Sequence, residues 1–258
     1  MNNELTSALP YQPPIIDIAT GLGGSMAHSP DFSNLTNYSM NLTMSGSRSA
    51  DRRNLLRNFQ SPPARGHHCH HTYSYNYNPT NGKASAEMQL VTARTHIATY
   101  PHAGAVRQWN TSGNHQHRYR SIMEEAVTSP VKYSKEELAK FQIAFNTKIP
   151  AELADAYLNQ STITSSFRIK GSDETVHIAE LLALFEIPDQ REIPDVGYVI
   201  ETLKRNGISI YSRDSNNEPI PYAEDDCGNI FYYSFDNNDN VHYWFYDHEY
   251  DEYFEIGQ

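Results

Sequence analysis

Alternating hydrophobic and polar positions predict strands in the first half of the chain. Tyrosines occupy every second position in one short stretch, at Tyr73, Tyr75 and Tyr77, which is typical of one face of a strand. The Asn-Pro-Thr-Asn-Gly segment at 78–82 predicts a turn, and residues 87–91 predict a returning strand. Thr92 can then cap a short helix that Pro101 ends. We therefore expect a strand, a turn, a strand and a helix here.

Helical spacing of apolar residues dominates the start of the second half. Ser134 and Glu137 form a capping box in front of a predicted helix, and Pro150 stands near the first turn of the next one. Residues 195–206 have a further apolar face that Gly207 closes. Short alternating strands follow, at 208–211, 230–235 and 241–246. Helices followed by an antiparallel meander predict an α+β fold.

These patterns divide the chain into four parts. Residues 1–45 are rich in Asn, Ser, Thr, Gly and Pro and are interpreted as a flexible leader. Residues 46–110 hold the predicted ββα unit, and residues 111–133 form a polar connector. Residues 134–258 form the predicted α+β domain with an antiparallel sheet.

Charge is distributed unequally along the chain. Residues 1–130 carry ten Lys/Arg and seven Asp/Glu, a net charge of +3, whereas residues 131–258 carry ten and twenty-four, a net charge of −14. The first half, with its Arg and His residues, is suited to binding a polyanion such as nucleic acid. The strongly acidic second half repels nucleic acid and attracts basic protein surfaces. Solubility alone is the alternative explanation for the acidic half.

Composition excludes several protein classes. No apolar run approaches the roughly 20 residues of a membrane span, and the N-terminus lacks the features of a secretory signal. The two cysteines, Cys69 and Cys227, provide no disulfide framework. We expect a cytoplasmic protein without a membrane partner, although export by a signal-independent route is compatible with the sequence.

Histidines are the candidate metal-binding residues of the first half. In a folded ββα unit the start of the hairpin, with His70 and His71, lies against the helix that carries His96, and His102 follows six residues later. Three imidazoles could then surround one cation while the fourth stays free. Such ligands suit zinc or another first-row metal and leave room for water or phosphate. A purely structural metal site, or histidines that bind no metal, are the alternatives.

Residues 46–105 resemble the HNH/endonuclease VII-type nuclease domains of bacterial polymorphic toxins. The resemblance lies in Gly46–Asp51, the His-His pair, Met88–Val91 and the spacing from His96 to His102 and Gly104. It implies a metal-dependent endonuclease that hydrolyses phosphodiesters, with DNA as the expected substrate.

The resemblance also assigns roles to the histidines. It implies His71 as the general base, and His70, His96 and His102 as ligands of one divalent metal ion (zinc, magnesium or another first-row metal). Arginines could hold backbone phosphates; the candidates are Arg48, Arg52, Arg53, Arg65 and Arg107. Three positions depart from the family's pattern, at Cys69, Thr92 and Ala105, and they allow a weakened or decayed enzyme.

Residues 134–258 resemble the SUKH superfamily of bacterial immunity proteins. The resemblance lies in 149–158, in 220–229 and in 241–249, which reads Val-His-Tyr-Trp-Phe-Tyr-Asp-His-Glu. It implies an α+β domain that binds a toxin and has no catalytic residues. Plausible contacts with a basic toxin surface, in cis or in trans, are Asp225, Asp226, Asp247 and Glu249.

The working hypothesis is a toxin–immunity fusion, in which the acidic domain covers the phosphate-binding face of the nuclease by charge complementarity. The main alternative is a non-catalytic immunity or interaction protein whose first half is a decayed nuclease that serves as a scaffold. A DNA-processing enzyme regulated by its acidic domain is a third hypothesis.

Overall fold

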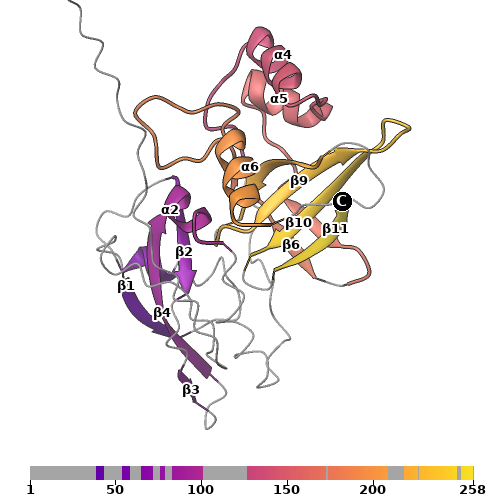
Figure 1. Cartoon of the computed structure of the whole chain (residues 1–258). Helices are drawn as coiled ribbons and strands as arrows, with labels where there is room; N and C mark the ends of the chain where they lie inside the picture. The colour runs from indigo at the N-terminus through magenta and orange to yellow at the C-terminus, as the bar shows by residue number, and fades with distance from the viewer. Residues whose placement is uncertain are drawn as a thin grey trace, which may run out of the picture.

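The computed structural model places two antiparallel sheets and their helices side by side (Figure 1). The residues that it describes are 39–43, 54–58, 65–71, 76–78, 83–100, 127–172, 174–208, 218–225, 227–248 and 251–257. Within these ranges, no helix combines the length and the apolar character needed to cross a bilayer. The chain is α+β, as its sequence predicts.

The N-terminal sheet consists of one long strand, β4 (Lys83–Thr92), and three shorter strands that each pair with it in antiparallel register. The shorter strands are β1 (Ser39–Thr43), β2 (His67–His71) and β3 (Asn76–Asn78). Helix α2 (Ala93–Ile97) follows β4 directly. The Thr92 hydroxyl accepts a hydrogen bond from Thr95 N at 3.3 Å, which confirms the predicted N-cap.

Strand β1 corrects the expectation of a flexible leader up to residue 45. Met40 pairs with Met88 and Leu42 with Ala86, and Met40 and Leu42 pack on the small hydrophobic cluster on this face of the sheet. The alternation of apolar residues in a stretch of only five is enough to add a strand once β4 offers a partner. The same cluster contains Leu55, Cys69, Met88, Leu90 and Cys227.

The C-terminal sheet has seven antiparallel strands in the order β6-β5-β11-β10-β9-β8-β7 and curls into a half-barrel. Its strands are β5 (Ser166–Ile169), β6 (Thr175–His177), β7 (Glu180–Leu181), β8 (Ile220–Glu224), β9 (Ile230–Phe235), β10 (Val241–Asp247) and β11 (Glu252–Gly257). Strands β9 and β10 confirm the two strands predicted near residues 230–235 and 241–246. Much of the predicted strand at 208–211 lies outside the described residues.

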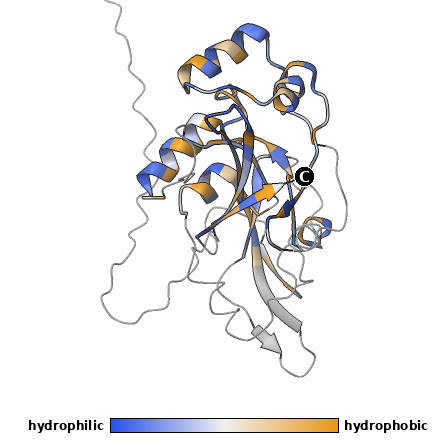
Figure 2. Cartoon of the chain, turned by 90° about the vertical axis from the view of Figure 1, so that its right-hand side faces the viewer, coloured by the Kyte–Doolittle hydropathy of each residue, from blue (hydrophilic) through white to orange (hydrophobic). Residues whose placement is uncertain are grey.

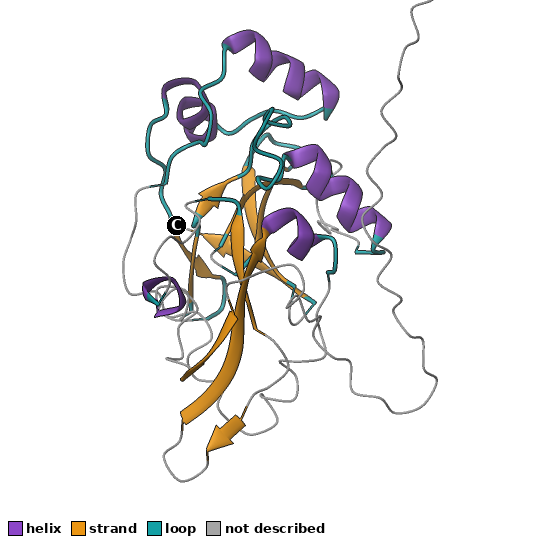
Figure 3. Ribbon diagram, turned by 90° about the vertical axis from the view of Figure 1, so that its left-hand side faces the viewer, coloured by secondary structure: helices purple, strands orange, loops and turns teal. Residues whose placement is uncertain are grey.

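Three helices accompany the C-terminal sheet: α4 (Lys135–Ala144), α5 (Ala151–Asn159) and α6 (Val196–Arg205). The predicted capping box is present, because Ser134 Oγ accepts from Glu137 N and Glu137 Oε2 accepts from Ser134 N. Gly207 follows α6 with φ +74°, as a C-terminal glycine should. Figure 2 shows blue and orange turns within the same helices, which is expected of helices with one buried and one exposed face. Figure 3 shows these helices beside and above the strands.

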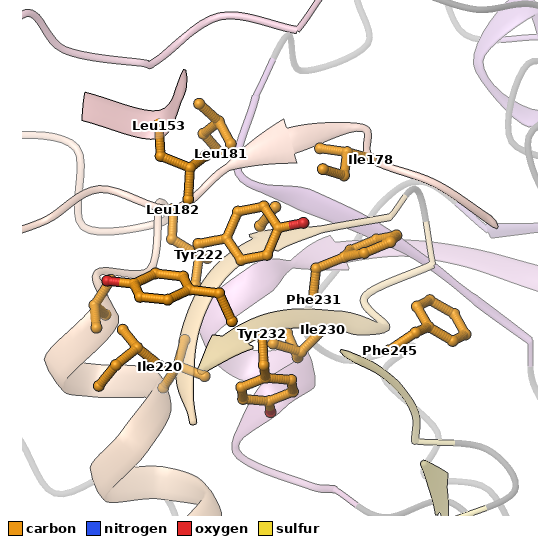
Figure 4. Close-up of a cluster of buried hydrophobic side chains, with 14 of the residues drawn as sticks. Leu153, Ile178, Leu181, Leu182, Ile220, Tyr222, Ile230, Phe231, Tyr232 and Phe245 are labelled. Atoms are coloured by element: carbon orange, nitrogen blue, oxygen red, sulfur yellow. The ribbon is translucent and has the colours of Figure 1, made fainter. Parts of the chain in front are cut away.

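The main hydrophobic core lies between the C-terminal sheet and its helices. Figure 4 shows its centre, where Tyr222 and Phe231 from neighbouring strands meet Leu153, Leu181 and Leu182. Two residues from the N-terminal unit, Ile97 and Tyr100, belong to the same core. The two units therefore share hydrophobic packing and are not merely tethered.

Buried tyrosines in this core make different use of their hydroxyl groups, which leads to a prediction. Tyr157 donates a hydrogen bond to Leu182 O at 3.1 Å, whereas the buried Tyr222 hydroxyl has no hydrogen-bond partner among the described residues. Tyr157→Phe should therefore lower the free energy of unfolding by about 1 kcal/mol, and Tyr222→Phe should leave it unchanged or raise it. Urea denaturation of both variants checks this, and an equal loss in both would contradict it.

Candidate functional site: a buried histidine cluster between the two sheets

Strand alternation brings two histidines of β2 to the same side of the N-terminal sheet. His68 and His70 are two residues apart, so they share a face, and they lie next to His96 of the short helix α2. Their exposed fractions are 1%, 2% and 0%. Cys69, between them, belongs to the hydrophobic cluster on the opposite face. The local fold thus separates the imidazoles from the apolar face.

His96 connects the other two rings in a chain. Its Nδ1 lies 3.1 Å from His68 Nδ1, and its Nε2 lies 3.0 Å from His70 Nδ1. Both distances are those of hydrogen bonds between ring nitrogens. A shared cation would instead need one nitrogen of each ring to point at a common centre. The part of the chain that the structure describes contains no group of three His, Cys, Asp or Glu side chains arranged to hold a metal. The expected ligand His102 lies outside this part, so the metal site stays a prediction.

The C-terminal unit closes the cluster from the other side. Glu224 Oε1, at the end of β8, lies 2.9 Å from His68 Nε2. The ring of His248 contacts His96 edge to face and stacks on Tyr100, with ring centroids 5.0 and 4.2 Å apart. Asn229 Oδ1 lies 2.8 Å from His248 Nδ1 and holds this ring in place. The buried imidazoles therefore receive contacts from both units.

The three contacts of the cluster differ in kind. The two ring nitrogens of His96 are within hydrogen-bonding distance of His68 Nδ1 and His70 Nδ1. The His68 Nε2 atom lies close to the Glu224 carboxylate but makes no hydrogen bond of good geometry among the described residues. The contact of His68 with Glu224 is therefore a close polar contact between two buried side chains, one from each unit.

A tight turn shapes the C-terminal wall of the cluster. Asp225 Oδ1 accepts hydrogen bonds from the backbone N–H groups of Cys227 and Asn229, both at 2.9 Å. Asp225 Oδ2 accepts one from the side-chain amide of Asn229. Gly228 has φ +89°, and a Cβ atom there would overlap the Tyr100 hydroxyl and the His68 ring. The Tyr100 hydroxyl also donates to Gly228 O. The missing side chain at position 228 makes the close approach of the two units feasible.

Polar contacts at the side of α2 continue the interface. Arg94 pairs with Asp195 at 2.8 Å, and its guanidinium carbon lies 4.3 Å from the ring centroid of Tyr198. The Tyr198 hydroxyl donates to Arg94 O at 2.7 Å. The Asn206 amide donates to Ala98 O and Tyr100 O, at 3.2 and 3.0 Å. The C-terminal unit thus binds both a side chain of α2 and the carbonyl groups beyond its end.

A second carboxylate lies at the edge of this interface. Glu180 Oε2 accepts from Gly66 N at 3.3 Å, and Arg65 Nε lies 3.7 Å from Glu180 Oε1. Burial, together with the nearby Glu224 carboxylate, raises the pKa of Glu180 to about 7. Gly66, with φ +66°, packs closely against Glu192 and Ile193.

The structure describes only some of the residues that we expect to form a nuclease site. His70 and His96 lie side by side, and His68 contacts the other ring nitrogen of His96. His71 ends strand β2, and its side chain is not described; His102 lies outside the described residues. Arg65 is exposed and pairs with Glu180. The other predicted phosphate-binding arginines, Arg48, Arg52, Arg53 and Arg107, lie outside the described residues.

The predicted partner contacts of the acidic half have unexpected positions. Asp225 is only partly exposed and organises the 225–229 turn. Asp247 is fully buried, so it cannot contact a partner surface in this conformation. Asp226 and Glu249 lie outside the described residues. The placement of Asp225 and Asp247 therefore favours a role inside the fold.

Several residues of the cluster were not predicted from the sequence. His68 could have been found, because period-two alternation places it on the same face as His70. His248, Tyr100 and Glu224 carry no local signal, since they reach the cluster only through the packing of the two units.

The chemistry available to the cluster follows from its burial. Imidazoles with at most 2% exposure cannot reach a phosphodiester or exchange a metal with solvent in this conformation. The arrangement supplies instead a network of hydrogen bonds and ring contacts that fixes one unit on the other. These contacts join residues of both units in one buried intramolecular contact.

Comparison with known protein families gives one match. The sequence model of the SMI1 / KNR4 family (SUKH-1) matches residues 132–258. No curated protein and no solved structure matches the chain. The matched range covers the C-terminal unit and begins after the N-terminal sheet, so the match does not extend to the part of the chain that resembles a nuclease.

Gly228 provides a test of the close contact between the units. Gly228→Ala should lower the free energy of unfolding by about 2–4 kcal/mol, because it adds a clash with Tyr100 and His68 to the strain of a positive φ. Gly207→Ala is the matched control, since its φ of +74° carries the same strain and nothing lies within 4 Å of the added Cβ. Thermal and urea denaturation measure both, and equal losses would show that the contact contributes nothing.

The raised pKa of Glu180 predicts a pH dependence of stability. The folded state keeps the Glu180 proton up to a pKa of about 7, whereas the unfolded state loses it near 4.5, so the free energy of unfolding should fall as the pH rises from 4.5 to 7 and stay level above. Glu180→Gln removes this titration. It should therefore gain stability relative to wild type by up to about 3 kcal/mol between pH 5 and pH 8.

The matched control for this comparison is Glu186→Gln, because Glu186 is exposed. Its stability difference from wild type should stay constant over the same pH range. Parallel curves for wild type and Glu180→Gln would contradict the assignment.

Proposed function

Residues 132–258 form an SMI1/KNR4 (SUKH-1) domain, and on this premise we propose that the chain acts by binding a protein toxin and blocking it. The family match carries the proposal, because domains of this kind are typical of the immunity proteins of polymorphic toxins. The proposal corresponds to a non-catalytic immunity protein, in which the first half serves as a scaffold.

Charge supports a basic toxin as the partner. Residues 131–258 have a net charge of −14, and many acidic side chains lie at the surface of the described part. The exposed ones are Glu136, Asp155, Glu186, Asp189, Glu201, Glu218, Asp239, Asp251 and Glu252. Such a surface attracts a basic protein at long range and accelerates its association, with a rate that falls as salt is added. Toxins that bind nucleic acid need basic surfaces and therefore suit this domain.

A metal-dependent nuclease in the first half is the second candidate, and one observation favours it. His70 and His96, two of the expected ligands of a zinc, magnesium or other first-row metal ion, lie 3.0 Å apart between their ring nitrogens. Burial of both rings argues against activity in the closed chain. DNA cleavage would require release of the N-terminal unit from the SUKH-1 domain.

Co-expression tests the proposed function. The full chain should restore growth to bacterial cells that express one member of a panel of basic nuclease domains from polymorphic toxins, and the purified pair should form a complex that weakens as salt rises. Growth assays and titration calorimetry at two salt concentrations measure this. A chain that neither protects against nor binds any of these toxins would refute the proposal.

The same preparation separates the second candidate from the first. Incubation of the full chain, and of the Arg94→Glu variant that breaks the contact of Arg94 with Asp195 and so weakens the closed arrangement, with plasmid DNA and Mg²⁺ or Zn²⁺ should leave the plasmid intact in both cases if the first half is a scaffold. Cleavage that disappears with chelator and in His71→Ala would favour the nuclease instead.

A further inference from the structure

One continuous face of the SUKH-1 domain holds the N-terminal unit. We call it the docking face, and its members are Glu180, Asp195, Tyr198, Asn206, Glu224, Gly228 and His248. The part of the chain that lies on it is the docked segment, residues 65–71 and 83–100. Helix α2 of the docked segment lies beside α6 of the domain (Figure 1).

The docking face has the anatomy of a protein–protein interface. Ile97 and Tyr100 of the docked segment are 0% and 3% exposed and insert into the domain's core cluster. Polar contacts surround these anchors, including the Arg94–Asp195 pair, in which both side chains remain partly exposed. Apolar anchors within a polar rim, with Tyr and Arg prominent, are typical of interfaces between separate proteins.

Specific chemistry determines what this face can bind. Two of its carboxylates, Asp195 and Glu224, meet an arginine and a histidine, and the third, Glu180, meets Arg65 and the Gly66 N–H group. Asn206 donates two hydrogen bonds to the carbonyl groups of Ala98 and Tyr100, just beyond the end of a helix. The face therefore suits a strand followed by a short helix that carries cationic or imidazole side chains.

The extent of the family match gives the docked segment a separate status. The match begins at residue 132, so the docked segment is an addition to the SUKH-1 domain and covers a surface of it. Contacts within one chain resemble transient interfaces in composition and can be exchanged for contacts with another protein.

We propose that the docking face is the surface with which the SUKH-1 domain binds its toxin, and that the docked segment occupies this surface in cis. The inference rests on the proposed function and adds the site and its regulation. A toxin that presents a basic strand–helix unit must displace the docked segment. Its apparent affinity is then the affinity for the open domain multiplied by the fraction of chains that are open.

Two substitutions that both open the chain should have opposite effects on toxin binding. Arg94→Glu damages the docked segment and leaves the docking face intact, so toxin affinity should rise about tenfold. Asn206→Asp places a carboxylate against the carbonyl groups that Asn206 now binds. It damages the docking face itself, so toxin affinity should fall. Arg57→Glu is the matched control for the charge change, because Arg57 is exposed outside the docked segment, and its affinity should stay within about twofold of wild type.

Cys227 provides an independent measure of opening. It is fully buried in the cluster that includes Met88 and Leu90 of the N-terminal sheet, so release of that sheet should expose its thiol. In a Cys69→Ala background, Arg94→Glu and Asn206→Asp should both raise the rate of Cys227 labelling at least about tenfold, whereas Arg57→Glu should not. Circular dichroism shows whether the domain stays folded.

A mixture of two chains tests the docking face without any toxin. An Arg94→Glu chain has an intact face, and an Asn206→Asp chain with Cys227→Ala has an intact docked segment. When they are mixed, the second chain should bind the first in trans and slow the labelling of its Cys227. Light scattering should detect the 1:1 complex.

The outcomes separate this inference from the proposed function. If toxin binds wild type, but Arg94→Glu and Asn206→Asp change its affinity in the same direction or not at all, the docking face is not the toxin site and the proposed function stands. If no toxin binds while the mixed chains protect Cys227, the toxin function fails and the face is confirmed only as a docking surface. Failure of the mixed chains to associate refutes exchange at this face.

Discussion

The contact of His68 with both His96 and Glu224 is the constraint on which the arrangement of the two units depends. His68 is almost fully buried, and a buried imidazole needs partners for both of its ring nitrogens. His96 of α2, in its own unit, lies within hydrogen-bonding distance of its Nδ1. The Glu224 carboxylate of β8, in the SUKH-1 domain, lies 2.9 Å from its Nε2, although this contact lacks the geometry of a hydrogen bond. Neither unit alone supplies both polar neighbours, so the docked arrangement is the one that places a polar group beside each nitrogen of this histidine.

Backbone shape reinforces this electrostatic constraint at two glycines. Gly66 lies in the N-terminal unit and approaches Glu192 and Ile193, while Gly228 lies in the SUKH-1 domain and approaches Tyr100 and His68. Both have positive φ angles, which only glycine adopts without strain. Each unit therefore has a glycine, which lacks a side chain, at a position where the other unit approaches its backbone closely. Complementary shape on both sides indicates that this contact is built into the sequence.

Local signals in the sequence predicted local structure well and long-range contacts poorly. The caps at Thr92 and Ser134 were predicted because they depend on neighbours three residues away. Pairing of His70 with His96 was anticipated from a hairpin packed on a helix. The participation of His248 was not, because it depends on how two separate units pack, and no periodicity encodes that. Asp225 and Asp247 were expected at a partner surface because the resemblance to immunity proteins implied acidic contacts with a basic toxin, whereas the fold uses Asp225 to shape a turn and buries Asp247.

The polar character of the interface bears on how the protein could work. An interface made only of packed apolar side chains would be stable but hard to exchange, whereas ion pairs and buried histidines gain little net stability because their desolvation offsets much of their attraction. The Arg94–Asp195 pair is partly solvated, so its loss in cis could be compensated by a similar pair in trans. From the docked segment, Ile97 and Tyr100 enter the main core, and Met88 and Leu90 share the smaller cluster with Cys227 of the domain. A docked segment held in this way covers the docking face of the domain. A partner with similar charges and larger apolar side chains can still displace it.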